Sequence, residues 1–322
     1  MTERINNEFL EIRKTIELNN SIAISGHINP DGDAVGACAA LAISLKLLGK
    51  DVCVIMEDYP DNFRTIPTQG LFVTQVASDY IPDLYIVLDC GDKERLGKNA
   101  NLFDKALHTL NIDHHISNTY FTKENYVDTE ASSASEIVFQ LLYGYAPIDA
   151  DIAAAIYAGI VFDTGGFRHS STTPITMAIV SALMEYDFSF TEIYNSIFHS
   201  RSISEAKLLG IALSNLKEYF GGRCVATCVT KKDLEKIGAQ GDGFSEISSY
   251  MKGIWGVVVV IVVHEKSDGL YKVSMRSDNP INVSEVAMTF GGGGHKLASG
   301  CVIEGNADEV IEKILREIEK QL

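Results

Sequence analysis

The 322-residue chain has no long apolar run. Its most apolar segment, Val257–Val263, is far shorter than the ~20 residues that a membrane-spanning helix needs. The first four residues lack the basic-then-apolar order of a signal peptide. We therefore expect a cytoplasmic protein that does not interact with a membrane.

Paired cysteine motifs are also missing. None of the six cysteines forms a Cys-x-x-Cys pair, so the sequence does not support a cysteine-rich zinc site. In a cytosolic protein such scattered residues are expected to be reduced and buried. Cys90 follows Asp89 directly and could lie near a site there, but we interpret it as a small core residue. The six are Cys38, Cys53, Cys90, Cys224, Cys228 and Cys301.

Positive charge is scarce relative to negative charge. The chain has 27 Lys and Arg against 43 Asp and Glu, which gives a formal net charge of -16. Binding of long duplex nucleic acid needs a Lys/Arg surface that neutralises phosphates, so this balance opposes it. A short anionic substrate stays compatible with the composition, because bound cations would make the local potential positive.

The first part of the chain alternates strand and helix patterns. Strand–helix–strand order is typical of a parallel sheet, so an α/β domain is predicted. Strands are predicted at 21–25, 52–56, 84–89 and 108–112, and helices at 5–19, 34–48, 132–143, 149–162 and 173–186.

The second part has a different pattern, which predicts a smaller α+β domain with a mixed sheet. Strands are predicted at 223–229, 256–264 and 270–276, followed by one that begins near Ser299, and helices at 232–237, 283–290 and 308–320. We expect a parallel-sheet domain at 1–190, a helical linker at 191–219 and the mixed-sheet domain at 220–322.

Histidine and aspartate recur at the ends of the predicted elements. The turn after strand 21–25 holds His27, Asp31 and Asp33. Later elements end at Asp89, at Asp113-His114-His115 and at Asp163. Because open parallel sheets place their sites at the carboxyl ends of strands, these side chains are expected to meet. Carboxylate and imidazole ligands are suited to Mn²⁺ or Mg²⁺, so we predict a site for two divalent cations.

Each of these residues also has an ordinary structural explanation. Asp31-Gly32-Asp33 alone would be turn chemistry, Asp89 could begin a loop, and Asp163 could end a helix. For each of these alone, the structural explanation is the more common one. Their shared position at element ends is what favours a metal site.

A glycine run marks the second domain. Gly291–Gly294 removes four side chains in succession, so backbone N–H groups could approach an anion, and His295 follows at once. A flexible loop is the alternative. Arg276, with Ser277, ends a predicted strand and is suited to bidentate phosphate binding, although a surface salt bridge is equally compatible with the sequence.

Together these motifs resemble the DHH phosphoesterase superfamily. Asp113-His114-His115 corresponds to the motif that names it, 27–36 to its first motif, Asp89 to the second and Asp163 to the fourth. Segment 291–300, with Arg276-Ser277 before it, resembles the C-terminal domain of the family. In length and domain content the chain is most similar to the bifunctional oligoribonucleases (nano-RNases) and 3′-phosphoadenosine-5′-phosphate (pAp) phosphatases.

The resemblance implies a role for each motif residue. His27, Asp31 and Asp89 would hold one cation, and Asp33, Asp89, His114 and Asp163 the other. Asp89 would bridge the two, and Mn²⁺ is the expected ion, with Mg²⁺ or Co²⁺ as alternatives. His115 would act with Asp89 in catalysis by facing the substrate phosphate. Arg276, Ser277, Gly293, Gly294 and His295 would bind substrate.

The implied activity is hydrolysis of short oligoribonucleotides, linear dinucleotides or pAp by a metal-activated water. The alternatives are an exopolyphosphatase-like or pyrophosphatase-like hydrolase and a non-catalytic nucleotide sensor. The expected partners are short RNA or a mononucleotide bisphosphate, and the chain could form a homodimer, as relatives do.

Overall fold

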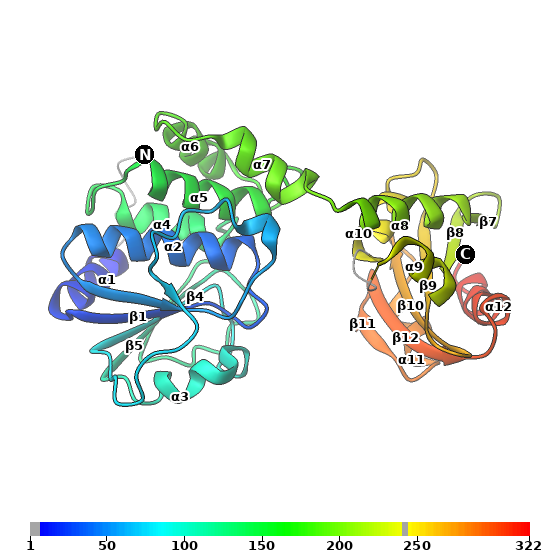
Figure 1. Ribbon diagram of the computed structural model, residues 1–322, viewed down its shortest axis with the longest axis horizontal. Helices are drawn as coiled ribbons and strands as arrows, with labels where there is room; N and C mark the ends of the chain where they lie inside the picture. Colours follow the sequence, from blue (N-terminus) through cyan, green and yellow to red (C-terminus); the bar gives the residue numbers. More distant parts are fainter. Residues whose placement is uncertain (1–6, 240–243) are drawn as a thin grey trace. The chain divides into compact units, whose positions relative to one another are not determined.

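The computed structural model describes residues 7–239 and 244–322, which divide into two units after Ser200. Each unit has its own six-stranded sheet and its own buried core (Figure 1). The start of the predicted helix 5–19 lies outside the described residues. The predicted fold class, a parallel-sheet domain followed by a smaller mixed-sheet domain, is confirmed.

The first unit is built on a parallel sheet with the strand order β3-β2-β1-β4-β5-β6. Its strands are β1 (Ser21–Ser25), β2 (Asp51–Ile55), β3 (Phe72–Val73), β4 (Leu84–Leu88), β5 (His108–Asp113) and β6 (Glu124–Val127). The chain runs outward from β1 to β3 and then returns to the other side of β1 with β4. Strand order thus reverses between β1 and β4, and α/β sheets bind ligands beside such a point.

Helices cover the two faces of this sheet unequally. In Figure 1, α2 (Gly32–Leu47), α4 (Ala134–Leu142) and α5 (Ala150–Asp163) lie on one face and α3 (Ala100–Phe103) on the other. The unit also contains α1 (Asn7–Leu18), η1 (Asp61–Phe63), η2 (Glu94–Asn99), α6 (Pro174–Leu183) and α7 (Phe190–His199). Helix α2 is buried from Gly32 to Leu45, which explains why its sequence is apolar on all sides.

Two glycines allow α2 and α5 to pack closely. A Cβ atom on Gly36 would lie 2.5 Å from the carbonyl oxygen of Ala155. A Cβ atom on Gly159 would lie 1.9 Å from Ser135 Oγ and 2.6 Å from Asp33 Oδ1. These contacts are far shorter than van der Waals contact, so only glycine fits at either position without a shift.

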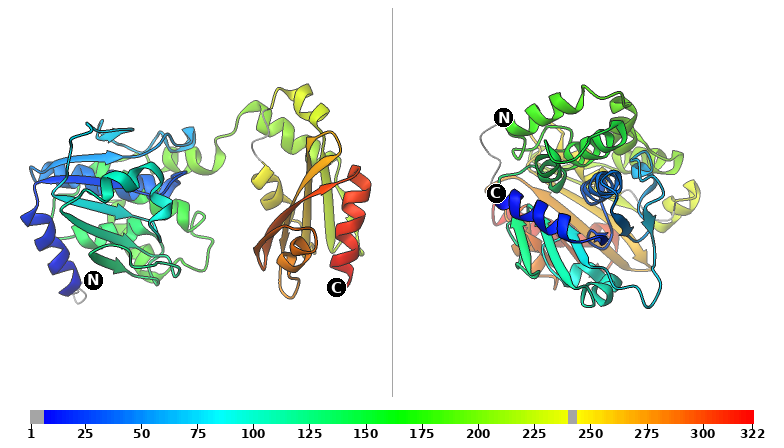
Figure 2. Two further views of the ribbon diagram at one scale, coloured as in Figure 1. Left: turned by 90° about the horizontal axis from the view of Figure 1, so that it is seen from below. Right: turned by 90° about the vertical axis from the view of Figure 1, so that its left-hand side faces the viewer.

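The second unit has a mixed sheet with the order β11-β12-β10-β9-β8-β7. Among its described strands, β8 and β9 are the one pair that is parallel. Figure 2 shows the C-terminal helix α12, in red, along one face of this second sheet. Its elements are α8 (Ile203–Ser214), β7 (Lys217–Tyr219), β8 (Cys224–Val229), α9 (Lys231–Ile237), α10 (Phe244–Lys252), β9 (Val259–Ser267), β10 (Leu270–Ser277), α11 (Val283–Met288), β11 (Gly293–His295), β12 (Ala298–Glu304) and α12 (Ala307–Glu319).

The segment predicted as a helical linker, 191–219, is divided between the units. Helix α7 packs on α5 and η1 in the first unit. Helix α8 packs on β8, α9 and α10 in the second, and β7 is an edge strand of the second sheet. Both helices have buried apolar side chains, Ile193 in α7 and Leu208 in α8, and these side chains fix each helix to one unit.

The expectation of free, buried thiols holds for Cys38, Cys90, Cys224 and Cys301, whereas Cys53 and Cys228 are half-buried. The six cysteines are free, and four of them are buried. Among the described residues, no helix combines the length and apolarity needed to span a bilayer.

Candidate active site

The carboxyl ends of three parallel strands bring the predicted ligands of the first unit together. His27 follows β1, Asp89 follows β4 and His114 follows β5. Two more ligands, Asp31 and Asp33, come from the start of α2, and the sixth, Asp163, is the last residue of α5. His27 and Asp89 therefore lie at the point where the strand order reverses, as ligand sites in open α/β sheets do.

His27, Asp31 and Asp89 form a first group, whose ligand atoms lie within 4.8 Å of one another. His27 Nε2 is 3.6 Å from an oxygen of each carboxylate. His27 Nδ1 donates to the carbonyl oxygen of Ile28 at 2.7 Å, and this bond turns Nε2 toward the carboxylates. Asp31 Oδ1 caps α2 by accepting from two backbone N–H groups, which leaves Oδ2 for the site.

Asp33, His114 and Asp163 form a second group. His114 Nε2 lies 3.2 Å from Asp163 Oδ2 and 3.9 Å from Asp33 Oδ2. Asp33 is fully buried and accepts from the backbone N–H groups of Ala134 and Ser135 at 2.6 and 2.9 Å. These donors belong to the first residues of α4, so a helix N-terminus stabilises the buried carboxylate.

Asp89 lies between the two groups. Its Oδ2 is 3.6 Å from His27 Nε2 and its Oδ1 is 3.4 Å from His114 Nε2. The side chain is 3% exposed, and Oδ1 accepts no hydrogen bond from the described residues. A buried carboxylate oxygen that accepts no hydrogen bond is costly unless water or an ion satisfies it. Asp89 also has a φ of 53°, a left-handed conformation that is strained for aspartate and recurs at functional sites.

The electrostatics of the cluster favour bound cations. Burial raises the pKa of Asp33 to about 7 and that of Asp163 to about 8, and the neighbouring carboxylates act in the same direction. Burial alone would lower the pKa of His27 and His114, yet the surrounding carboxylates raise both to about 10. Without a cation, the carboxylates of the site therefore do not all ionise together at neutral pH. Bound divalent cations would balance their charge and let them ionise.

The residues present fit divalent cations. The donor set consists of carboxylate oxygens and imidazole nitrogens, and Asp89 Oδ1 accepts no hydrogen bond from a described residue. Three overlapping groups of three residues are preformed, because Asp89, His114 and His115 form a group beside the two above. Oxygen and imidazole donors without thiolates favour Mn²⁺ or Mg²⁺ over a structural zinc.

His115 has a different environment from His114. Its Nδ1 lies 2.7 Å from Asp113 Oδ1 and 3.5 Å from Asp89 Oδ1. The hydrogen bond to Asp113 raises the pKa of His115, and burial opposes this shift without cancelling it. Because Asp113 occupies Nδ1, the ring has only Nε2 left for another partner, and its side chain is 35% exposed.

Of the predicted residues in the second unit, Arg276 and His295 share a sheet face. Each is the register partner of Ala298 across its neighbouring strand, so the three side chains stand on the same face. Gly293 and Gly294 are exposed and belong to β11, so the glycine run predicted as a loop is partly an edge strand. A Cβ on Gly294 would lie 2.6 Å from the carbonyl oxygen of Ala298, and this explains the glycine there.

The structure does not bring Ser277 to that face. Its side chain is 4% exposed, and its hydroxyl donates to the carbonyl oxygen of Ile281 at 2.9 Å. Alternation along β10 explains the difference, because neighbouring residues of a strand point to opposite faces. Ser277 therefore stabilises the turn after β10.

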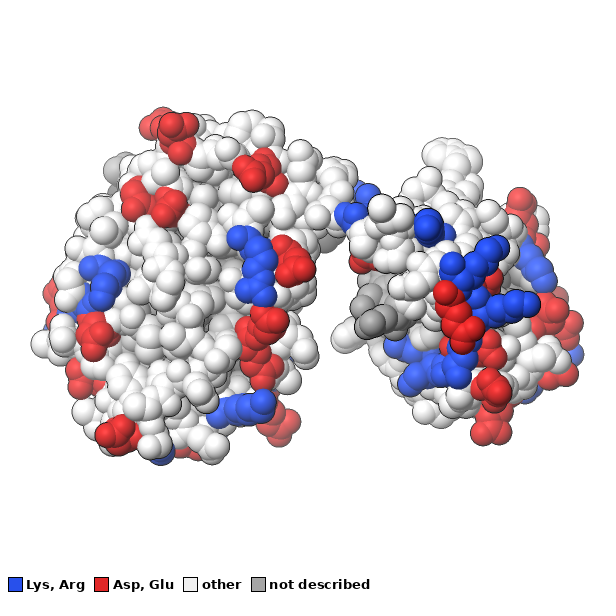
Figure 3. Space-filling view, in the orientation of Figure 1, with Lys and Arg blue, Asp and Glu red and all other residues white. Residues whose placement is uncertain are grey.

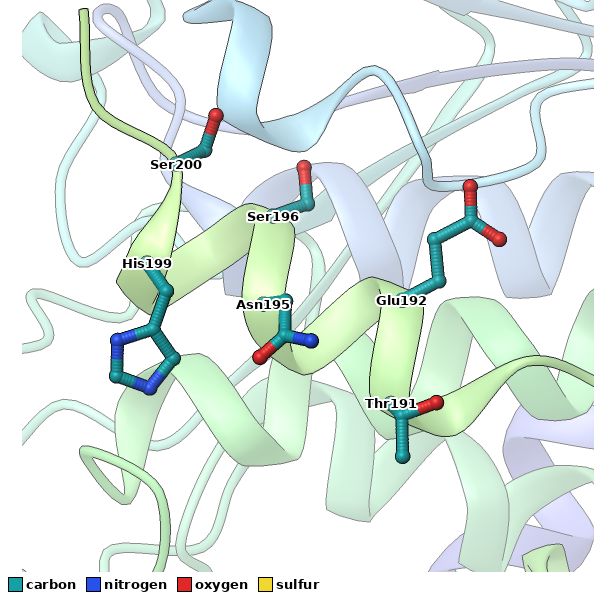
Figure 4. Close-up of a pocket in the computed structure, with 6 residues that line it drawn as sticks. All are labelled: Thr191, Glu192, Asn195, Ser196, His199 and Ser200. Carbon is teal, nitrogen blue, oxygen red and sulfur yellow. The ribbon is translucent and has the colours of Figure 1, made fainter.

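A surface depression along α7 is separate from the cluster. Figure 4 shows its lining, which comes from α7 and the following residue and includes none of the predicted ligands. Ser196, one of the lining residues, donates to the carbonyl oxygen of Asn62 at 2.7 Å.

Sequence reasoning missed the amides behind Asp113. Asn111 and Asn118 are buried, and Asn118 donates to Asp113 Oδ2 at 2.6 Å. The available signal was Asn111 itself, a polar residue between two apolar residues of a short strand.

The chain matches the DHH family, N-terminal domain, over residues 21–160 and the DHHA1 domain over residues 221–322. It therefore belongs to the DHH family of phosphoesterases, as its motifs indicate.

Within the family, the chain is similar to proteins named bifunctional oligoribonuclease and PAP phosphatase NrnA. It is 30% identical over 316 residues to the one from Thermus thermophilus, covering 97% of this chain and 93% of the relative. For the one from Bacillus subtilis the identity is 30% over 323 residues, with 96% and 97% covered. A solved structure of an exopolyphosphatase-related protein from Bacteroides fragilis matches with a TM-score of 0.85 at 25% identity, covering 99% and 98%.

Proposed function

We propose that this protein hydrolyses short oligoribonucleotides and pAp with the help of two divalent cations. The observation that carries the proposal is the buried cluster around Asp89, which belongs to two of three overlapping groups of possible ligands and whose Oδ1 accepts no hydrogen bond from a described residue. The full-length similarity to proteins named oligoribonuclease and PAP phosphatase supports the substrate class.

The proposed ligands fall into two sets that share Asp89. One cation would be held by His27, Asp31 and Asp89. The other would be held by Asp33, Asp89, His114 and Asp163, and Mn²⁺ is the proposed ion, with Mg²⁺ or Co²⁺ as alternatives. When bound, such cations supply Lewis-acid charge and lower the pKa of a water molecule toward neutrality.

Protein groups would orient the phosphate. His115 can donate from Nε2 to a non-bridging phosphate oxygen, because Nδ1 is engaged by Asp113. In the second unit, the Arg276 guanidinium and His295 can contact phosphates of the nucleotide over the small residues of β11 and β12. Gly293 and Gly294 would allow the nucleotide to approach the backbone closely.

The surface charge is consistent with a short substrate. On the face shown in Figure 3, Lys and Arg groups alternate with Asp and Glu groups and do not form a continuous basic surface. Tracking a long duplex needs such a surface, whereas a nucleotide bisphosphate needs a few placed donors.

A second candidate activity is hydrolysis of pyrophosphate or polyphosphate. It is favoured by the structural match to a protein named exopolyphosphatase-related.

A homodimer stays a prediction, which light scattering of the purified chain would test.

The test is a comparison of kcat/KM for dinucleotide RNA, pAp, pGpG and pyrophosphate with Mn²⁺ present. The proposal expects dinucleotide RNA and pAp to be the best substrates. Preference for pyrophosphate would favour the second candidate, and binding of all four without turnover would indicate a nucleotide sensor.

A further inference from the structure

A buried chain of amides connects the turn after β4 to the loop after β5. Asn111 is fully buried in β5, and its Nδ2 donates to the carbonyl oxygens of Val87 and Cys90 at 3.1 and 3.3 Å. Its Oδ1 accepts from Asn118 Nδ2 at 2.7 Å. Asn111 therefore ties Asn118 to the backbone beside Asp89.

The orientation of the Asn118 amide is determined by its neighbours. Its Oδ1 accepts from the backbone N–H of Tyr120 at 2.7 Å, so the other side of the amide must be the donor. That Nδ2 group donates to Asp113 Oδ2 at 2.6 Å as well as to Asn111. The other oxygen of Asp113, Oδ1, is 2.7 Å from His115 Nδ1.

We propose that Asn118 is a positioning residue that aims the His115 ring at the substrate phosphate through Asp113. The inference rests on the proposed function, because it gives His115 a substrate contact. A carboxylate that accepts two directed hydrogen bonds has a fixed plane, and a fixed plane fixes the ring it binds.

The loop has few other restraints that could orient His115. Ile116, the next residue, is 90% exposed and has no packing role. Backbone bonds from Asn118 N to the His115 carbonyl at 3.1 Å and from Thr119 N to the Gly91 carbonyl at 2.8 Å fix the path of the chain. Neither bond acts on the imidazole. The ring contacts Asp89 Oδ1 at 3.5 Å and the His114 ring at 4.7 Å between centroids, and its one short hydrogen bond among the described residues is the 2.7 Å bond to Asp113.

The proposal predicts that Asn118→Ala lowers kcat about 10- to 100-fold, the usual effect of removing a group that orients a site residue. KM should change little, and the protein should still bind two Mn²⁺ per chain. In a His115→Ala background, Asn118→Ala should cause no further loss, because its effect passes through that ring.

Thr119→Val is the matched control. It removes a hydroxyl bond to the Gly91 carbonyl at 3.1 Å in the same loop but leaves Asp113 untouched. It should retain the wild-type kcat. If Asn118→Ala does not fold, Asp113→Asn replaces it, with the same expected loss of kcat and the same absence of effect without His115.

Two results would overturn the inference. One is an active wild-type enzyme whose kcat is unchanged by a folded Asn118→Ala or Asp113→Asn substitution. The other is a double variant whose losses multiply, which would show that Asn118 acts independently of His115. An inactive wild-type protein would instead reject the proposed function, so the two failures are distinguishable.

Discussion

Substitution of Gly159 by alanine should displace the Asp33 carboxylate and so lower the activity of the site. Gly159 lies in α5 one turn before Asp163, and the added Cβ would be 1.9 Å from Ser135 Oγ. A change of the Ser135 rotamer would not remove the conflict, because Ser135 Cβ at 2.7 Å and Asp33 Oδ1 at 2.6 Å are also too close. Helix α5 or the Asp33 carboxylate must therefore move.

The distances set the expected loss of stability and activity in Gly159→Ala. Ordinary contact begins near 3.4 Å, so the shift needed is close to an ångström. Overpacking of this kind costs about 1–3 kcal/mol, partly offset by the ~1 kcal/mol that alanine gains over glycine in a helix. A displacement of that size in a catalytic site can cost about 100-fold in rate, so activity should fall strongly while the protein loses at most about 2 kcal/mol of stability.

The assay measures kcat, Mn²⁺ affinity and the thermal unfolding midpoint of Gly159→Ala. Gly210→Ala in α8 is the matched control, because its Cβ would meet nothing within 4 Å. The control should keep kcat and gain about 1 kcal/mol of stability. A Gly159→Ala protein with wild-type kcat and Mn²⁺ affinity would refute the close packing behind Asp33.

Three further predictions concern protons, ligands and substrate. Burial raises the pKa of Asp163 to about 8. Burial would lower the pKa of His114, but the neighbouring carboxylates raise it to about 10. The folded metal-free protein therefore holds protons that the unfolded chain releases. Its melting temperature after chelation should therefore fall as pH rises from 6 to 10, and stabilisation by Mn²⁺ should grow; a rise without metal would contradict this. Asp163→Asn should reduce hydrolysis of every substrate by at least about 100-fold and lower Mn²⁺ stoichiometry by calorimetry. Arg276→Ala should raise KM for pAp about 10- to 100-fold with kcat nearly unchanged, whereas Arg316→Ala in α12, 75% exposed, should have no effect on either.

The clustering of these His and Asp residues was predictable because parallel strands end at one edge. His27, Asp89 and His114 each follow a short apolar run, and the pattern of such runs indicates a parallel sheet. The short edge strands were not predictable. β3 and β11 have two and three residues, too few for an alternating pattern to appear.

Other features depend on spatial neighbours that a sequence does not contain. The bond from Asn111 to the Cys90 carbonyl requires the register of β4 on β5, where Leu88 opposes Ile112. The role of Gly159 requires the crossing of α5 with α2 and α4. The burial of Ser277 was within reach, since strand alternation separates it from Arg276.

The most direct test of the two-cation site is reconstitution of chelated protein with Mn²⁺. We expect the metal-free wild type to be inactive on dinucleotide RNA and pAp, and activity to return as two Mn²⁺ bind per chain. Asp89→Asn, which keeps the shape of the side chain that both proposed ligand sets share and removes its charge, should not recover. Hydrolysis at the wild-type rate by the chelated protein, or by Asp89→Asn, would contradict the account.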